Sequence, residues 1–77
     1  MSLLLPQTRA GTVRSATPIS IHGDRYVDLV VALDDEPGPP NAGRVGAGEC
    51  PESLAAGERV NVRFTMGVIV RVEREGS

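Results

Sequence analysis

Cysteine and histidine, residue types that often act as nucleophile and general base, occur once each in the chain, as Cys50 and His22. A catalytic pair needs the thiol and the imidazole within hydrogen-bond reach, and a zinc site needs several such ligands at short spacings. Cys50 and His22 lie far apart in the sequence and have no further partner of either type. They therefore predict neither a Cys–His catalytic pair nor a zinc site.

Acidic side chains gather in the run Asp34-Asp35-Glu36. Hard cations prefer carboxylate oxygens, so such a run is a pattern in which a cation site is sought. Three prolines follow within the next four residues, however, and no ligand spacing repeats. The stretch from 34 to 41 predicts a solvated loop, and no metal or other cofactor is expected.

The sequence has little else that could support catalysis. It has no lysine and no glycine-rich phosphate loop followed by a helix. His22 precedes Gly23 and Asp24, which are typical of an exposed turn. A chain of 77 residues also leaves little beyond one small domain. We expect no catalytic activity, with a small enzyme as the remote alternative.

The charge and the aromatic content bear on nucleic-acid binding. All eight basic residues are arginine, ten acids outnumber them, and the formal net charge is -2. Affinity for nucleic acid comes from neutralising phosphates, and single strands stack their bases on aromatic rings. Aromatic residues make up only 3% of this chain. The composition therefore disfavours a nucleic-acid partner.

Alternation of apolar and polar residues recurs along the chain, which predicts a mainly β domain. A first strand is expected from about Thr8 to Ile21, with Val13, Ile19 and Ile21 at odd positions and Arg14 and Ser20 between them. Pro18 cannot donate to a ladder and should mark an edge, a bulge or a bend. After a turn at 22–25, a second strand over Tyr26–Asp34 has a core face of Val27, Leu29, Val31 and Leu33. The register of this hairpin stays open, because a two-residue turn and an odd-length loop put Ile21 on different faces.

Two shorter elements are expected between this hairpin and the C-terminal part of the chain. A short strand, weakened by glycine, fits Gly43–Ala47. Pro51 suits the first position of a helix and Gly57 suits the left-handed residue that ends one. We therefore expect a helix of about two turns over Pro51–Gly57. Leu54 on this helix should close one end of the core.

The clearest alternation forms a final hairpin, whose apolar residues are Val60, Val62, Phe64, Val68, Val70 and Val72. A three-residue loop Thr65-Met66-Gly67, with Gly67 left-handed, predicts that Phe64 lies in the core opposite Val68. The same register pairs Val62 with Val70 and Val60 with Val72. On the outer face it pairs Arg63 with Ile69, Asn61 with Arg71 and Arg59 with Glu73.

The expected order is strand, strand, short strand, short helix, strand, strand. It is carried by the hairpin from Thr12 to Leu33 and by the run from Pro51 to Val62. This order resembles the OB-fold, a small five-stranded, partly open barrel with a helix between its third and fourth strands. An SH3-like barrel is the main alternative, although its helical turn usually precedes only the last strand. The prediction is one domain over 1–77, with flexible or non-native ends at 1–7 and 75–77.

The resemblance implies a binding module, because OB-folds engage ligands with strands two and three and with two adjoining loops. On this sequence the corresponding regions are the outer face of Asp28, Val30 and Ala32 near Arg44, the loop His22–Tyr26 and the turn Thr65–Gly67. A nucleic-acid contact there would rest on Tyr26, the one aromatic residue outside the core, with Arg25, Arg63 and Arg71.

The same outer face also mixes apolar and charged side chains, as protein–protein interfaces do. Its apolar members are Tyr26, Val30, Ala32 and Ile69. The candidate contact residues are therefore His22, Arg25, Tyr26, Asp28, Val30, Arg63, Ile69 and Arg71. We expect a non-enzymatic binding or accessory module that acts through a protein partner or through self-association. Binding of single-stranded nucleic acid is the alternative function.

The first six residues, Met1–Pro6, have no basic residue and only three apolar residues in a row. They predict neither a signal peptide nor a membrane span. The lone cysteine excludes an intramolecular disulfide, which fits a reducing compartment. A cytoplasmic protein without membrane contact is expected.

Overall fold

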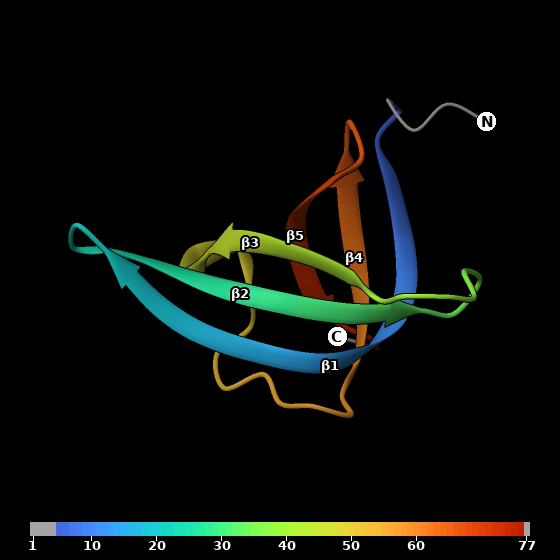
Figure 1. Cartoon of the computed structure of the whole chain (residues 1–77), viewed down its shortest axis with the longest axis horizontal. Coiled ribbons are helices and arrows are strands. Elements are labelled where there is room, and N and C mark those ends of the chain that lie inside the picture. The colour runs from blue at the N-terminus through green and yellow to red at the C-terminus, as the bar shows by residue number, and fades with distance from the viewer. Residues whose placement is uncertain (1–4, 77) are drawn as a thin grey trace.

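The computed structural model describes residues 5–76 and confirms a mainly β structure (Figure 1). Its elements are β1 (Gln7–Ile21), β2 (Asp24–Leu33), β3 (Asn41–Gly46), the 3-10 helix η1 (Ala47–Glu49), β4 (Arg59–Thr65) and β5 (Val68–Arg74). The strands form one five-stranded sheet in the order β3-β2-β1-β4-β5, and every neighbouring pair is antiparallel. Of the expected flexible ends, residues 1–4 and 77 lie outside the described residues, whereas Gln7 opens β1.

Strand β1 is long and bends, and its two parts pair with different strands of the sheet (Figure 1). Its first residues, Gln7–Thr12, pair with β4, while Gly11–Ile21 pair with β2. Within residues 5–76, β1 beyond Val13 therefore has one hydrogen-bonded strand neighbour, β2. This part of the β1–β2 hairpin, Ser15–Val30, is called the arm. Pro18 lies in this single-neighbour stretch, which confirms that it marks an edge.

A bulge between Val13 and Ser15 changes which residues of β1 face the core. The extra residue reverses the alternation, so Val13 is buried but Ile19 lies opposite Tyr26 on the outer face. The odd positions of Val13, Ile19 and Ile21 therefore do not place these residues on one face, and Ile21 lies on the outer face with Ile19. The turn His22-Gly23, with φ of 50° and 85°, closes the hairpin with Ile21 opposite Asp24.

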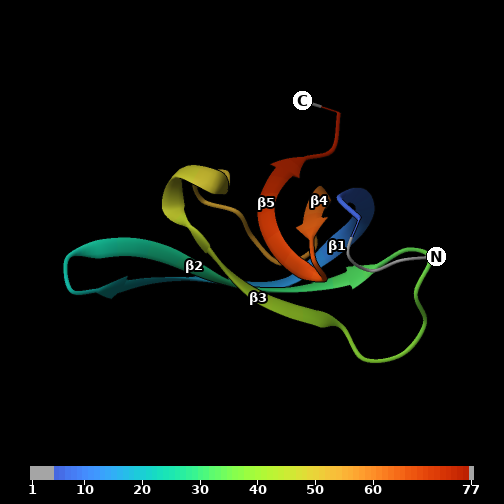
Figure 2. The same cartoon turned by 90° about the horizontal axis from the view of Figure 1, so that it is seen from above.

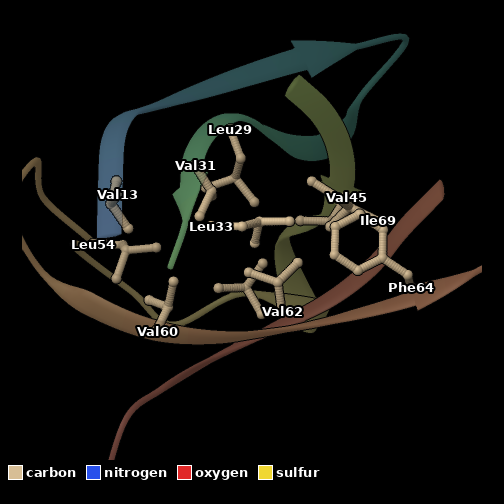
Figure 3. Close-up of a cluster of buried hydrophobic side chains, with 11 residues drawn as sticks. Val13, Leu29, Val31, Leu33, Val45, Leu54, Val60, Val62, Phe64 and Ile69 are labelled. Atoms are coloured by element: carbon tan, nitrogen blue, oxygen red, sulfur yellow. The ribbon is translucent and has the colours of Figure 1, made fainter. Parts of the chain in front are cut away.

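The core lies on one face of the sheet and is entirely apolar among the described residues (Figure 3). Its members are Val13, Leu29, Val31, Leu33, Val45, Leu54, Val60, Val62, Phe64, Ile69 and Val72. Strand β2 has no bulge, and its predicted core face is confirmed, because Leu29, Val31 and Leu33 are buried and Val27 packs against them. The predicted burial of Phe64 is also confirmed.

The β4–β5 hairpin differs from its predicted register. Its turn has two residues, Met66 and Gly67, with φ of 53° and 76°, so Phe64 lies opposite Ile69 rather than Val68. Ile69 is consequently only 4% exposed, whereas Val68 is 58% exposed. The extra residue Val70 forms a bulge that brings Val72 opposite Val62. The predicted pairs Val62–Val70 and Val60–Val72 are therefore wrong, since Val60 lies opposite Arg74. On the outer face, Arg63 lies opposite Arg71 and Asn61 opposite Glu73.

The predicted helix over Pro51–Gly57 is wrong, since the only helical residues described are Ala47–Glu49. A seven-residue helix would be marginal by itself, and Ser53 adopts a left-handed φ of 56° that interrupts it. Gly57 does have the expected left-handed backbone, with φ of 92°. Leu54 is buried as predicted, although it enters the core from an irregular segment.

The outer strands β3 and β5 approach each other without a hydrogen-bonded ladder between them. Gly43 of β3 packs directly on Ile69 of β5, where an added Cβ would lie 3.1 Å from the Ile69 Cβ atom. Side-chain packing, rather than backbone pairing, therefore joins these two strands in the described part of the chain.

Candidate functional site

A groove of about 580 Å³ lies between the β1–β2 arm and the segment from η1 to Leu54. Figure 2 shows η1 and the following loop standing over one face of the arm. The lining comes from the arm residues Ala16, Pro18, Ile19, Ser20, Arg25, Tyr26 and Val27 and from Ala47, Cys50, Pro51, Glu52, Ser53 and Leu54. The groove is thus built by two segments that are far apart in the sequence.

The bulge in β1 determines which side chains face this groove. Because it reverses the alternation, Pro18 lies opposite Val27 and Ser20 opposite Arg25, on the core side of the sheet. Ala16 and Val27 also pack against the core, so they form a continuous apolar floor with it. Arg25 adds a charge at the end of this floor nearest the hairpin turn.

The opposite wall is held in place by hydrogen bonds from Glu58, at the end of the same loop, and from Arg74 of β5. The Glu58 carboxylate accepts the Ala55 backbone N–H at 2.7 Å and Arg74 Nε at 2.8 Å. Arg74 also donates to the Glu52 carbonyl oxygen at 2.9 Å. The Arg74 guanidinium and the Ala55 amide together lower the pKa of Glu58, so this carboxylate stays charged at neutral pH. The wall is therefore preformed without a regular helix.

Backbone hydrogen bonds anchor the same wall to β1 where the bulge begins. Gly57 N–H donates to the Val13 carbonyl oxygen at 2.8 Å, and Val13 N–H donates to the Glu58 carbonyl oxygen at 2.9 Å. These bonds satisfy the backbone of Val13. Further along the strand, from Ser15 to Ile21, β2 is the only strand of the described chain that pairs with β1. An unpaired strand edge therefore borders the groove.

Cys50 lies between the groove and a second hollow of about 320 Å³ next to β5. It is a free, half-buried thiol that packs against the core. Burial raises the pKa of this thiol, and the nearby Arg74 offsets the rise in part. His22 occupies the hairpin turn and does not line the groove, so the structure does not bring these two residues together there.

Most arginines are matched with acids. The residues Arg9, Arg44, Arg59, Arg71 and Arg74 all form ion pairs. The acidic loop takes part in these pairs, since Arg9 contacts Asp35 at 2.6 Å and Glu36 at 2.9 Å. No cluster of three or more acids, histidines or cysteines within residues 5–76 could hold a metal ion.

Comparisons with protein families, curated proteins and solved structures found no match. In the stretch from 5 to 76, no helix has the length and apolar character needed to span a membrane.

The predicted contact residues are spread over separate places. Asp28 lies on the outer face opposite Arg44, which donates to it at 2.7 Å and lowers its pKa. Tyr26 and Val30 are half-buried on the same face. Figure 1 shows the hairpin turn that carries His22 far from the β4–β5 turn, so the outer face is not joined to both predicted loops.

On the β4–β5 hairpin the predicted contacts change most. Ile69 is buried in the core, so the prediction that it lies on the outer face as a contact residue is wrong. Arg63 lies directly opposite Arg71, and Arg71 forms an ion pair with Glu49 at 3.2 Å. Only Arg25 and Tyr26 of the predicted residues line the groove.

Sequence reasoning missed the groove walls, above all Ala16, Cys50 and Pro51. The reversal at Arg14 moves the even-numbered side chains of β1 to the groove side, and no alternation in the sequence marks that change. The proline at position 18 was the one signal for an open edge. It predicted an edge, but not the groove beside it.

Proposed function

We propose that this protein is a non-catalytic binding module that takes a segment of a partner protein into the groove beside β1. The observation that carries the proposal is the position of the groove, which combines a preformed apolar floor with an unpaired strand edge. Concave sites lined by apolar side chains and a few polar groups are the usual form of a ligand site. Exposed strand edges are likewise a recurrent means of binding extended peptides.

The charges and aromatic residues of the groove support a protein partner over a nucleic acid. Its charged lining residues are Arg25 and Glu52, which have opposite signs. Tyr26 lies opposite Ile19 and Gly46 and is one of the residues that line the groove, and no second aromatic residue lines it. A track for a phosphate backbone needs concentrated positive charge and stacking platforms. Neither is built into this groove.

We propose further that the sheet is an OB-like, partly open barrel. The pairing of β1 with both β2 and β4 supports this assignment, as does the contact of Gly43 with Ile69 between β3 and β5. A helix between the third and fourth strands is missing, and only the short η1 occupies that position. The proposed binding groove lies between the arm and this reduced connection.

A peptide selection tests the proposed function. Random twelve-residue peptides displayed on phage are selected on the folded protein, and the enriched peptides are then measured against two variants. Ser20→Trp fills the groove face of β1, whereas Thr17→Trp places the same side chain on the outer face, opposite Asp28. Binding should be lost in Ser20→Trp and kept in Thr17→Trp. Equal binding to both variants, or enrichment of no peptide while a labelled oligonucleotide binds tightly, would overturn the proposal.

A further inference from the structure

We infer that the partner segment binds as an added β-strand along the free edge of β1, with an acidic side chain next to Arg25. The inference rests on the proposed function and specifies its mode of recognition and the chemistry of the partner. It combines three observations on the described residues: the direction of the backbone groups on β1, the proline in the middle of that edge, and the unpaired arginines at its two ends.

The register indicates which backbone groups face outward. In a two-residue hairpin the residues that flank the turn form a hydrogen-bonded pair, here Ile21 and Asp24. Alternate residues of a strand direct their N–H and C=O groups to opposite edges. Ala16 and Ser20 therefore present both groups to the free edge, and Pro18 presents its carbonyl oxygen. An extended peptide can bond to these groups while its alternate side chains enter the apolar groove.

Pro18 distinguishes a partner segment from a second copy of the same strand. It has no N–H, so a peptide that pairs with this edge loses one hydrogen bond opposite Pro18. In a symmetric pairing of two β1 strands about this position, two prolines would meet and both of their hydrogen bonds would be missing. Proline on an edge strand is a known means of preventing such self-pairing. The edge therefore favours a different chain.

The charges at the two ends of this edge indicate an acidic partner. Arg14 lies at the bulge where the free edge begins, and Arg25 lies opposite Ser20 near its end. Neither forms an ion pair with a carboxylate of residues 5–76, although most other arginines do. A partner carboxylate would complete these pairs. Arg63, on β4 away from the groove, shares their lack of an acidic partner within the described chain and supplies a matched control.

Synthetic peptides test the mode of binding. The first is a ten-residue peptide of alternating valine and threonine with two glutamates at each end, and the second carries lysines in place of the glutamates. A third keeps the glutamates and is N-methylated at alternate residues on the edge that would face β1. Affinity is measured by calorimetry for the wild type, Arg25→Glu and Arg63→Glu, and binding is located by amide shifts in NMR spectra.

The acidic peptide should bind, with amide shifts centred on Ala16 and Ser20. N-methylation should weaken it about tenfold, and Arg25→Glu should weaken it about fivefold while Arg63→Glu has little effect. Equal affinity for the acidic, basic and methylated peptides would overturn strand addition. If all designed peptides fail but phage-selected peptides still need an open groove, the inference is wrong and the proposed function stands. If the phage-selected peptides also bind Ser20→Trp as tightly as the wild type, both the inference and the proposed function are wrong.

Discussion

Gly43 of β3 and Ile69 of β5 form the contact that joins the two outer strands of the sheet. A Cβ atom at position 43 would lie 3.1 Å from both Cβ and Cδ1 of Ile69. Ile69 is buried at this contact because the β4–β5 turn has two residues rather than three. The absence of a side chain at position 43 therefore lets the two strands approach without a ladder.

Substitution of Gly43 by valine should destabilise the protein. The added side chain would overlap Ile69, and overpacking of this kind costs about 1–3 kcal/mol. Gly46→Val is the matched control, since Gly46 lies on the same strand and no atom of the described residues lies within 4 Å of its added Cβ position. Urea unfolding measures both variants. Equal stability of the two would show that β3 and β5 do not need this close contact.

The β4–β5 turn should be sensitive to the residue at position 67. Gly67 has a φ of 76°, and a left-handed backbone costs an ordinary residue about 1–2 kcal/mol, so Gly67→Val should lower the free energy of unfolding. Met66, at φ 53°, is not the residue type such turns favour. Met66→Asn should therefore raise the melting temperature. A melting temperature unchanged in both variants would contradict the two-residue turn.

The pairing of Glu58 with Arg74 should make the stability of the fold depend on pH in the acidic range. The pKa of Glu58 lies below its ordinary value of 4.5, because Arg74 and the Ala55 amide hydrogen-bond its charged form. The unfolded chain binds this proton more readily, so the stabilisation is complete above pH 4.5 and is lost as the pH falls through the lowered pKa.

Glu58→Gln should accordingly melt below the wild type at about pH 7 and approach it at about pH 2.5. Thermal unfolding across this pH range measures the difference in melting temperature between Glu58→Gln and the wild type. Glu52→Gln is the control, because the Glu52 carboxylate forms no ion pair with residues 5–76. A difference in melting temperature that stays constant with pH would show that the Glu58 carboxylate does not stabilise the wall by its charge.

Cys50 should report on occupancy of the groove. Burial raises the pKa of its thiol above 9.0, and only the thiolate reacts with alkylating reagents. Alkylation of the folded chain at neutral pH should therefore be slower than that of the chain in denaturant, and should accelerate as the pH rises. A peptide selected on the protein should slow it further, since Cys50 lines the groove. Protection by a peptide that binds Ser20→Trp equally well would contradict this placement.

The sequence predicted the strands better than it predicted their faces. Strand β2 alternates without interruption, so Leu29, Val31 and Leu33 were correctly placed in the core. In β1 and β5 one extra residue each, Arg14 and Val70, reverses the alternation. Such bulges depend on pairing with a neighbouring strand and leave no periodic signal in one strand alone.

The helix predicted in the connection between β3 and β4 is wrong for a different reason. Pro51 and Gly57 are good local signals for the ends of a helix, but so short a helix depends on tertiary contacts. Here Arg74 and Glu58 bond the segment in another conformation. The groove could not be predicted because it depends on this loop and on the bulge in β1 together.

An NMR titration of the labelled protein with a phage-selected peptide tests the binding groove most directly. Amide shifts and line broadening should concentrate at Ala16, Ser20, Val27 and Cys50, and they should disappear in Ser20→Trp but persist in Thr17→Trp. Shifts confined to the exposed β4–β5 turn around Met66 and Val68, and unchanged in Ser20→Trp, would contradict binding in the groove.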